Sequence, residues 1–208
     1  MNFLFHMLLS GADDQILVGN FMGDFVKGPL VDRFPERIRQ GLTLHRRIDV
    51  FASQDELFRR SRQRIDPYIG LYRGVLVDLF YDHFLVREWD NWSIEPFDRY
   101  LARTRAIIER HGAELPERLQ ALVPIIFEEL LPSYETVAGI GKALERMSRR
   151  VARENPLAGA ERELVLNYAG LRADFQGFLP RVRSYAEYLI EEGIPAERTR
   201  NQPSAFAL

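Results

Sequence analysis

The chain has 208 residues, of which 46% are hydrophobic and 28% are charged, a composition that suits one globular domain with its own core. The formal net charge of −2 argues against a protein that coats nucleic acid, and the lack of cysteine excludes disulfides and thiolate metal ligands. The apolar opening, residues 1–9, has no basic leader and is shorter than the roughly 20 residues that cross a bilayer. We therefore expect a cytoplasmic protein with no membrane or nucleic-acid partner.

Apolar residues recur at steps of three and four along most of the chain, which predicts an all-α fold, a single-domain helical bundle. Prolines at 35, 67, 96 and 116 stand where first helical turns would begin. We expect one helical domain over residues 1–194 and a loose tail over residues 195–208. The predicted helices span 2–10, 13–27, 35–52, 54–65, 67–90, 95–111, 117–130, 134–153, 157–174 and 175–192.

The first two predicted helices each hold one residue of interest. His6 lies in an apolar stretch, NFLFH, and by itself is best explained as a core histidine. Asp24 lies in GNFMGDFVKG, near a helix C-terminus, where the helix dipole disfavours a negative charge. Either Lys27 neutralises this carboxylate or the carboxylate has a functional partner.

The predicted helix 35–52 carries His45 and Asp49 one turn apart on its apolar side. Both side chains should point inward. They are either a pair of metal ligands or a histidine whose tautomer is fixed by a carboxylate in a purely structural contact.

The segment from residue 27 to residue 64 is basic, with ten Lys or Arg against five Asp or Glu. Its strongest cluster is RRSRQR at 59–64. Such a run is either a solvated helix face or a surface for an anionic macromolecule or a phosphate-bearing ligand. Interleaved exposed aromatics, typical of single-strand binders, are missing from it.

The predicted helix 67–90 contains LYRGVLVDLFYDHFLV, which is apolar on nearly every side and so predicts a buried central helix. We expect its apolar residues Leu71, Val75, Leu79, Phe80 and Leu85 to be buried. Asp78 and Asp82 lie one turn apart, and two buried carboxylates need compensation. A divalent cation, arginines from elsewhere, or an edge open to water would each provide it.

Four blocks, MNFLFH, GNFMGDFVKG, LHRRIDVF and YDHFL, resemble in order and separation the acyl carrier protein phosphodiesterases. Weaker similarity continues through ALERMSRR and YAGLRADFQGFLPRV. The resemblance implies a helical fold related to HD-domain phosphohydrolases and a divalent metal such as Mn²⁺, with Mg²⁺ and Fe²⁺ as alternatives. It also implies hydrolysis of the phosphodiester that joins 4'-phosphopantetheine to a serine of acyl carrier protein. The family often has a second histidine where this chain has Leu8, and an aspartate where it has Ser53.

By this resemblance the family's acidic and imidazole residues fall on His6, Asp24, His45, Asp49, Asp78, Asp82 and His83. We assign the metal to Asp24, His45, Asp78 and Asp82. Asp24 is also assigned to catalysis, His83 or Asp49 orients or protonates a reacting group, and the role of His6 stays open. Lys27 and Arg46 are assigned to the phosphate, and Arg47, Arg59, Arg60, Arg62 and Arg64 to the acidic carrier protein. Two alternatives are a phosphohydrolase for nucleotides or small phosphoesters and a noncatalytic module that binds carrier protein.

Overall fold

The computed structural model describes residues 2–30 and 33–194, and within these ranges the chain is helical with no strand. The prediction of an all-α fold is confirmed. The predicted tail, residues 195–208, lies outside the described residues. The helices, with 3₁₀ and π segments marked η, are α1 (Phe3–Leu8), α2 (Asp14–Phe21), η1 (Gly23–Phe25), α3 (Glu36–Gln54), α4 (Glu56–Arg64), η2 (Pro67–Tyr72), α5 (Arg73–Arg87), η3 (Trp89–Asn91), α6 (Phe97–Arg110), η4 (Gly112–Glu114), α7 (Glu117–Gln120), α8 (Val123–Ile125), η5 (Ile126–Leu130), α9 (Leu131–Ser133), α10 (Val137–Arg150), α11 (Glu161–Leu166) and α12 (Tyr168–Glu191).

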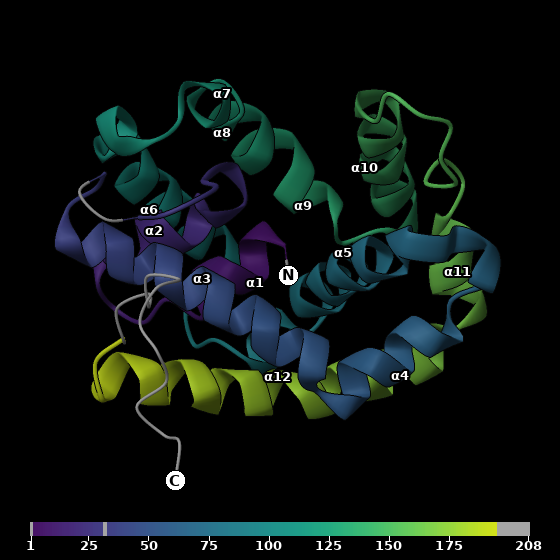
Figure 1. The fold of residues 1–208 in the computed structure, drawn as a ribbon. Helices are drawn as coiled ribbons and strands as arrows, with labels where there is room; N and C mark the ends of the chain where they lie inside the picture. Colours follow the sequence, from purple (N-terminus) through teal and green to yellow (C-terminus); the bar gives the residue numbers. More distant parts are fainter. Residues whose placement is uncertain (1, 31–32, 195–208) are drawn as a thin grey trace, which may run out of the picture.

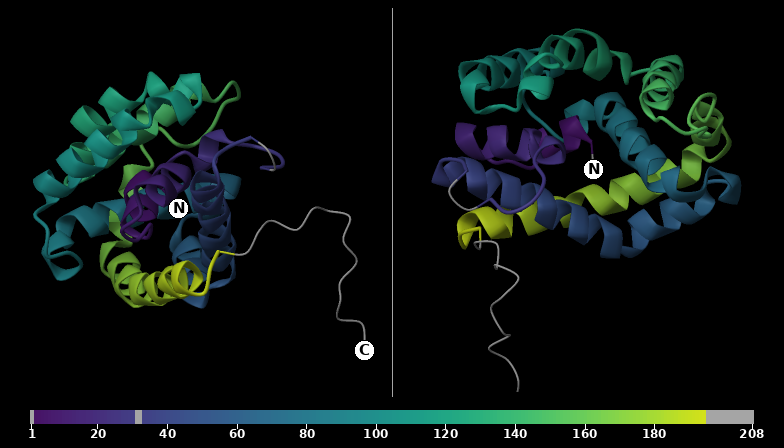
Figure 2. Two further views of the ribbon diagram at one scale, coloured as in Figure 1. Left: turned by 90° about the vertical axis from the view of Figure 1, so that its left-hand side faces the viewer. Right: turned by 45° about the horizontal axis from the view of Figure 1, so that its top comes forward.

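The helices are arranged in layers around the short helix α1 (Figures 1 and 2). One outer layer is formed by α12, against which α4 packs, and the opposite outer layer by the α6–α9 segment. Between them lie α1, α2 and α3, while α5 contacts α1, α4, α10 and α12. Among the described residues no helix is long and apolar enough to cross a membrane.

Helix α1 is held in the core by aromatic packing. The ring of Phe5 lies 6.2 Å from that of Phe175 in α12, edge to face, and 6.4 Å from that of Tyr81 in α5. Such aromatic contacts add to the stabilisation from buried area. Because α1 is anchored on two long helices, this packing also fixes the position of His6 in the last turn of α1.

The helix predicted over residues 67–90 is interrupted, which is a correction. Gly70 has φ of 58°, a conformation that glycine adopts readily, so the chain is kinked at this residue within η2 and α5 starts only at Arg73. The break turns the first part of the predicted apolar face outward: Leu71 is 96% exposed and Val75 is 38% exposed. Leu79, Phe80 and Leu85 are buried as predicted.

Other predicted boundaries shift as well. The helix predicted over residues 117–130 is divided into α7, α8 and the π segment η5. The pair predicted over residues 157–174 and 175–192 is observed as short α11 and a long α12 that runs through Pro180. Packing on α4 and α5 keeps α12 continuous where local pattern suggested a break.

Candidate metal centre

Helices α2 and α3 pack backbone against backbone, and this sets the depth of His45. A Cβ atom on Gly19 would lie 2.2 Å from the carbonyl oxygen of Ile38, and Gly41 meets the backbone of α2 equally closely. A Cβ atom on Gly23 would lie 2.1 Å from Cγ of His45. Glycine at these positions therefore lets the imidazole of His45 lie directly against the chain.

Asp82 fixes the start of helix α1. Its carboxylate accepts the backbone N–H of Phe5 at 3.1 Å and that of Leu4 at 3.3 Å, two first-turn groups that a helix cannot satisfy internally. Asp82 is fully buried, and this burial outweighs the two hydrogen bonds and raises its pKa to about 8. The carboxylate predicted as a metal ligand is thus directed at α1, the helix that carries His6.

Asn20 orients both histidines. The Nδ1 atom of His45 lies 2.8 Å from the backbone carbonyl oxygen of Asn20, which can only accept, so Nδ1 is the donor. The amide nitrogen of Asn20 donates to the carbonyl oxygen of His6 and to Ser10 Oγ, so its Oδ1 atom accepts from Nδ1 of His6 at 2.8 Å. In their neutral forms both imidazoles therefore have an unprotonated Nε2 atom.

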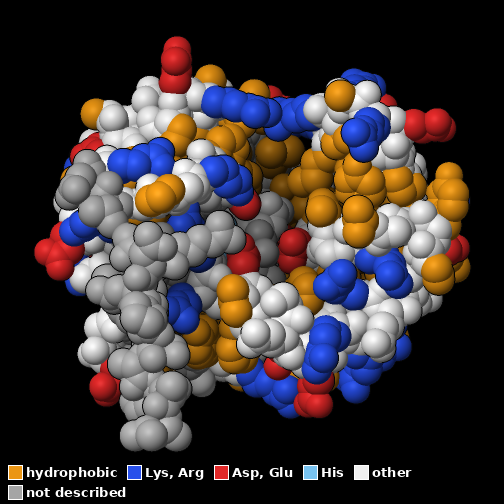
Figure 3. All heavy atoms as spheres, in the orientation of Figure 1, with side chains coloured by type: hydrophobic (Ala, Val, Ile, Leu, Met, Phe, Trp, Pro, Cys, Tyr) orange, Lys and Arg blue, Asp and Glu red, His pale blue; other side chains and the backbone are white. Residues whose placement is uncertain are grey.

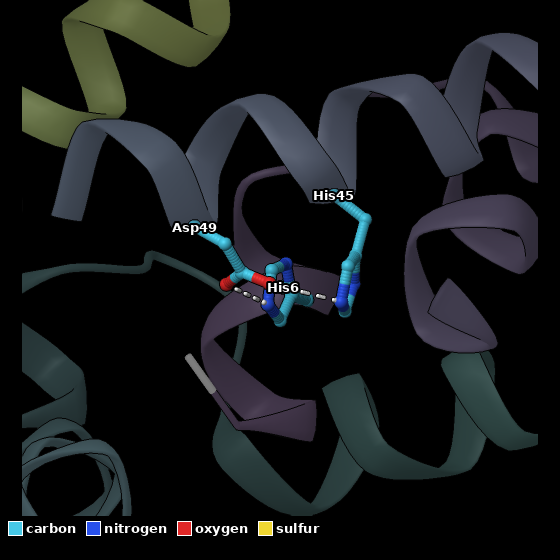
Figure 4. A group of neighbouring side chains, drawn as sticks. All are labelled: His6, His45 and Asp49. Carbon is cyan, nitrogen blue, oxygen red and sulfur yellow. Dashed lines mark ion pairs between the residues drawn. The ribbon is translucent and has the colours of Figure 1, made fainter. Parts of the chain in front are cut away.

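The two Nε2 atoms converge on Asp49 (Figure 4). His6 Nε2 lies 3.4 Å from Asp49 Oδ1, and His45 Nε2 lies 3.4 Å from Asp49 Oδ2. The imidazole rings are stacked with their centroids 3.8 Å apart. One ligand atom from each of the three residues lies within 4.8 Å of the others, and Asp24 Oδ1 lies 3.7 Å from His45 Nε2.

The two histidines have opposite pKa shifts. Burial lowers the pKa of His45, but the Asp24 and Asp49 carboxylates outweigh this effect and raise it to about 9. Burial and the neighbouring His45 lower the pKa of His6 to about 4. Although burial opposes it, hydrogen bonding to both histidines holds the pKa of Asp49 well below its usual range. The cluster therefore attracts one positive charge, which the proton on His45 supplies.

The cluster opens into a cavity of about 370 Å³ whose wall includes the carboxylates of Asp24, Asp49 and Asp78. Asp78 is half-buried, and burial, followed by repulsion from Asp49 and Asp24, raises its pKa to about 6. Acidic side chains are visible in the hollow at the centre of the molecule (Figure 3). Ser53, where the resemblance leads one to expect an aspartate, also lines this cavity.

These residues fit a divalent cation. Two imidazole nitrogens of fixed tautomer and the oxygens of Asp24 and Asp49 form a nitrogen and oxygen donor set, which divalent first-row metals accept. A cation would replace the proton on His45 and compensate the three carboxylates. Of the four metal ligands predicted from sequence, Asp24 and His45 join the cluster and Asp78 faces the same cavity, while Asp82 contacts α1.

His83, predicted to orient or protonate a reacting group, is buried elsewhere on α5. Its Nδ1 atom donates to the carbonyl oxygen of Tyr134 at 2.7 Å, and its Nε2 atom lies 3.1 Å from the hydroxyl of Tyr168. Both ring nitrogens therefore contact other segments, Tyr134 directly after α9 and Tyr168 in α12, and His83 is not among the residues that line the carboxylate cavity.

The residues predicted to bind phosphate lie around η1 and α3. Arg46 donates to the carbonyl oxygens of Val26 at 3.2 Å and Gly28 at 2.9 Å, so it holds the loop that follows Asp24. Lys27 and Arg47 are exposed.

The arginines of α4 divide into two faces. Arg60 and Arg64, one turn apart, form ion pairs with the fully buried Asp174 of α12, where Arg64 Nε lies 2.8 Å from Asp174 Oδ2. Arg59 and Arg62 lie three positions apart on another face, and Arg62 lies close to Gly74, which lines the carboxylate cavity. Two of the four α4 arginines that were predicted to contact the carrier protein thus also have a structural role.

Sequence reasoning did not identify Asn20 and left His6 open, although both are central to the cluster. The available signal was a carboxamide in the apolar run of α2, since a buried amide must find hydrogen-bond partners. Nothing local indicated that its partners would be two histidines from different helices.

The fold and this site define an all-helical domain with a candidate metal centre of two histidines and adjacent carboxylates. The chain belongs to the acyl carrier protein phosphodiesterase family, whose model matches residues 1–182. Two proteins with that name, from Photorhabdus laumondii and Yersinia pestis, are 31% and 30% identical to the chain over 192 and 193 residues. The matches cover 90% of this chain and 96% and 98% of the relatives. No solved structure matches the chain, so the likeness to HD-domain proteins stays a prediction.

Proposed function

We propose that this protein hydrolyses the phosphodiester between 4'-phosphopantetheine and a serine of holo acyl carrier protein, releasing the apo protein and 4'-phosphopantetheine. Family membership supports the reaction class. The observation that carries the proposal is the pair of Nε2 atoms converging on Asp49 beside an open, carboxylate-lined cavity. Such a site suits hydrolysis of a phosphate ester that enters from solvent.

We assign a divalent cation, Mn²⁺ by the family resemblance, to His6, His45, Asp49 and Asp24. When bound, such an ion polarises a phosphate oxygen and lowers the pKa of a water molecule. Asn20 keeps both imidazoles in the tautomer that this role requires.

The protein's own groups would then complete the reaction. The carboxylate of Asp78 takes a proton from the attacking water, whose oxygen bonds to phosphorus. The bond between phosphorus and the serine oxygen breaks, and the serine oxygen takes a proton from solvent. Asp78 suits this role because it faces the cavity and its pKa of about 6 is close to the working range of a general base.

We further propose that the carrier protein docks beside α4. Arg59 and Arg62 offer positive charge to an acidic partner, and the exposed Tyr68 and Leu71 offer apolar contact next to them. Basic and apolar side chains lie side by side in this region, adjoining the central hollow (Figure 3).

Mass spectrometry of holo carrier protein incubated with the purified protein and Mn²⁺ tests the reaction. The expected result is loss of the whole phosphopantetheine mass from the carrier protein. Binding without mass loss would favour a noncatalytic binding module. Hydrolysis of nucleotides with no action on holo carrier protein would favour a small-molecule phosphohydrolase.

Metal affinity is expected to rise with pH and to reach a plateau near pH 9. Without metal, the pKa of His45 is about 9, so at neutral pH a cation must displace its proton. Affinity should increase about tenfold per pH unit below that value. His6, with a pKa of about 4, has no proton to lose there.

Isothermal titration of Mn²⁺ in buffers of different ionisation enthalpy measures this effect. We expect release of about one proton per ion at pH 7 and a smaller release as pH approaches 9. Constant affinity between pH 6 and pH 8 would contradict the assignment of His45 as a ligand.

The double variant Arg59→Glu, Arg62→Glu is expected to lower kcat/KM for holo carrier protein by about tenfold or more at low salt, because like charges then face the acidic partner. The loss should shrink in 1 M salt, where charges are screened beyond about 3 Å. Turnover of bis(4-nitrophenyl) phosphate, a small diester, should be unchanged.

Arg60→Glu is the matched comparison on the same helix. It removes an ion pair with the fully buried Asp174, so its main expected effect is a lower melting temperature. If the double variant and Arg60→Glu changed stability and activity alike, the proposed docking face would be wrong.

A further inference from the structure

A second cavity adjoins the carboxylate cavity and has no role in the reaction as described so far. It has a volume of about 410 Å³, within the roughly 300–1,000 Å³ of small-molecule sites. It lies between α10 and the segment formed by α8, η5 and α9, and hydrophobic side chains gather in the hollow there (Figure 3). Its apolar lining comes mainly from Phe3, Ile125, Leu130, Ala143 and Met147.

The two cavities share a wall. Met147 lines both of them. Asn2, which lines the carboxylate cavity, donates a hydrogen bond of 3.4 Å to the hydroxyl of Tyr134, which lines the second cavity. A ligand bound at the carboxylates can therefore extend past Met147 without crossing the protein core.

We propose that this second cavity binds the pantetheine arm of the substrate, with Met147 as the residue that the arm passes. The proposal rests on the proposed function. The arm leaves the phosphate as a flexible chain of methylenes and methyl groups with two amides. The aliphatic and aromatic lining suits the hydrocarbon parts. Arg146 and Arg149 at the same cavity pair with Glu129 and Glu145 through one nitrogen each, and their other N–H groups can donate to the amide oxygens.

The position of the cavity separates the two halves of the substrate. The carrier protein would approach from the side of α4 and Gly74, where Arg62 lies. The arm would extend toward α10, past the side chain of Met147 and into the second cavity. The phosphate between them then lies over the carboxylate cavity, as hydrolysis requires.

Contacts from α5 help to hold the residues around the second cavity in place. His83 donates to the carbonyl oxygen of Tyr134 at 2.7 Å and so fixes the turn before α10. The segment Ile126–Leu130 is a π-helix, an irregularity found frequently at functional sites. His83 is thus a positioning residue for the arm cavity in this proposal.

Met147→Trp tests the proposal, because a large ring at a half-buried position would fill the shared wall. We expect kcat/KM for holo carrier protein to fall by about tenfold or more, as misplacement of a substrate costs this much or more. Mn²⁺ affinity should stay near wild type. Because Met147 also lines the carboxylate cavity, turnover of bis(4-nitrophenyl) phosphate is compared in Ala143→Leu, which lines the second cavity alone and should lower turnover of holo carrier protein more than that of the small diester. Val165→Trp on the exposed face of α11 is the control and should change none of these.

Binding of free pantetheine, measured by ligand-observed NMR, gives a readout that needs no turnover. We expect binding to the wild type, and its loss in Met147→Trp and in the milder cavity-filling variant Ala143→Leu. No pantetheine binding by the wild type, or equal losses for holo carrier protein and the small diester in Ala143→Leu, would overturn the proposal. A wild-type protein that binds pantetheine but leaves holo carrier protein intact would contradict the proposed function and not the arm cavity.

Discussion

Asp49→Asn is expected to abolish Mn²⁺ binding and turnover together. Asp49 is the residue that both histidines meet, with each Nε2 atom 3.4 Å from one of its oxygens. Losing this carboxylate should weaken metal binding by more than the roughly 10–100-fold seen when an outer-shell contact is lost. Since Asn has the same shape, the helical fold should be retained.

Titration of Mn²⁺ and turnover of holo carrier protein, with circular dichroism as the check on folding, measure this effect. Asp90→Ala, at an exposed acidic residue outside the cluster, is the control and should behave as wild type. His6→Ala should follow Asp49→Asn in direction if α1 contributes a ligand. Wild-type metal affinity in Asp49→Asn would rule out the cluster as the metal site.

Asp78→Asn is expected to lower kcat by about 10²–10⁴-fold while metal affinity changes little, because the amide cannot accept the proton of the attacking water. A loss of kcat without a loss of metal affinity would distinguish Asp78 from the metal ligands, to which the sequence analysis assigned it. Metal binding should fall with kcat if Asp78 is a ligand after all.

The pH profile gives an independent readout. Asp78 must be ionised to act as a base, so activity should fall as pH drops through its pKa, at about 6 without metal. A bound cation favours the carboxylate and moves this limb to lower pH. In saturating Mn²⁺, where competition between the metal and the His45 proton no longer limits activity, the limb should be absent in Asp78→Asn. A profile that is the same in both proteins would exclude Asp78 as the base.

Asp82→Asn is the matched comparison, one turn along the same helix. Its carboxylate contacts the backbone of α1 and lies apart from the histidine cluster. We expect a change in the stability of α1 with the acidic limb intact. If Asp82→Asn lost metal binding as completely as Asp49→Asn, Asp82 would be a metal ligand, as the sequence analysis predicted.

The sequence by itself determined the fold class and several inward-facing residues. Helical periodicity acts between residues three and four apart, so His45 and Asp49 could be placed on one face of α3. The apolar composition of residues 71–86 similarly predicted that the helix containing α5 would be central, and Leu79, Phe80 and Leu85 are buried. Four sequence blocks also sufficed to indicate the family, which the family model confirmed.

The hydrophobic pattern gave a wrong prediction where one residue with a positive φ interrupts the predicted helix. Gly70 breaks the predicted helix, so Leu71 and Val75 are exposed despite their apolar character. Hydrophobic periodicity assumes that a helix is continuous, and a glycine with positive φ removes that condition. The exposed residues now form part of the proposed docking face.

Only the tertiary structure decided how the polar residues are paired. His6 meets Asp49 from another helix, Asp82 binds α1, and Arg60 and Arg64 bind Asp174 more than 100 positions away. A buried polar group must find a partner, but its chemistry leaves open which one. The choice depends on how closely α2 and α3 approach and on where α12 lies, and these are properties of packing that no local pattern of residues contains.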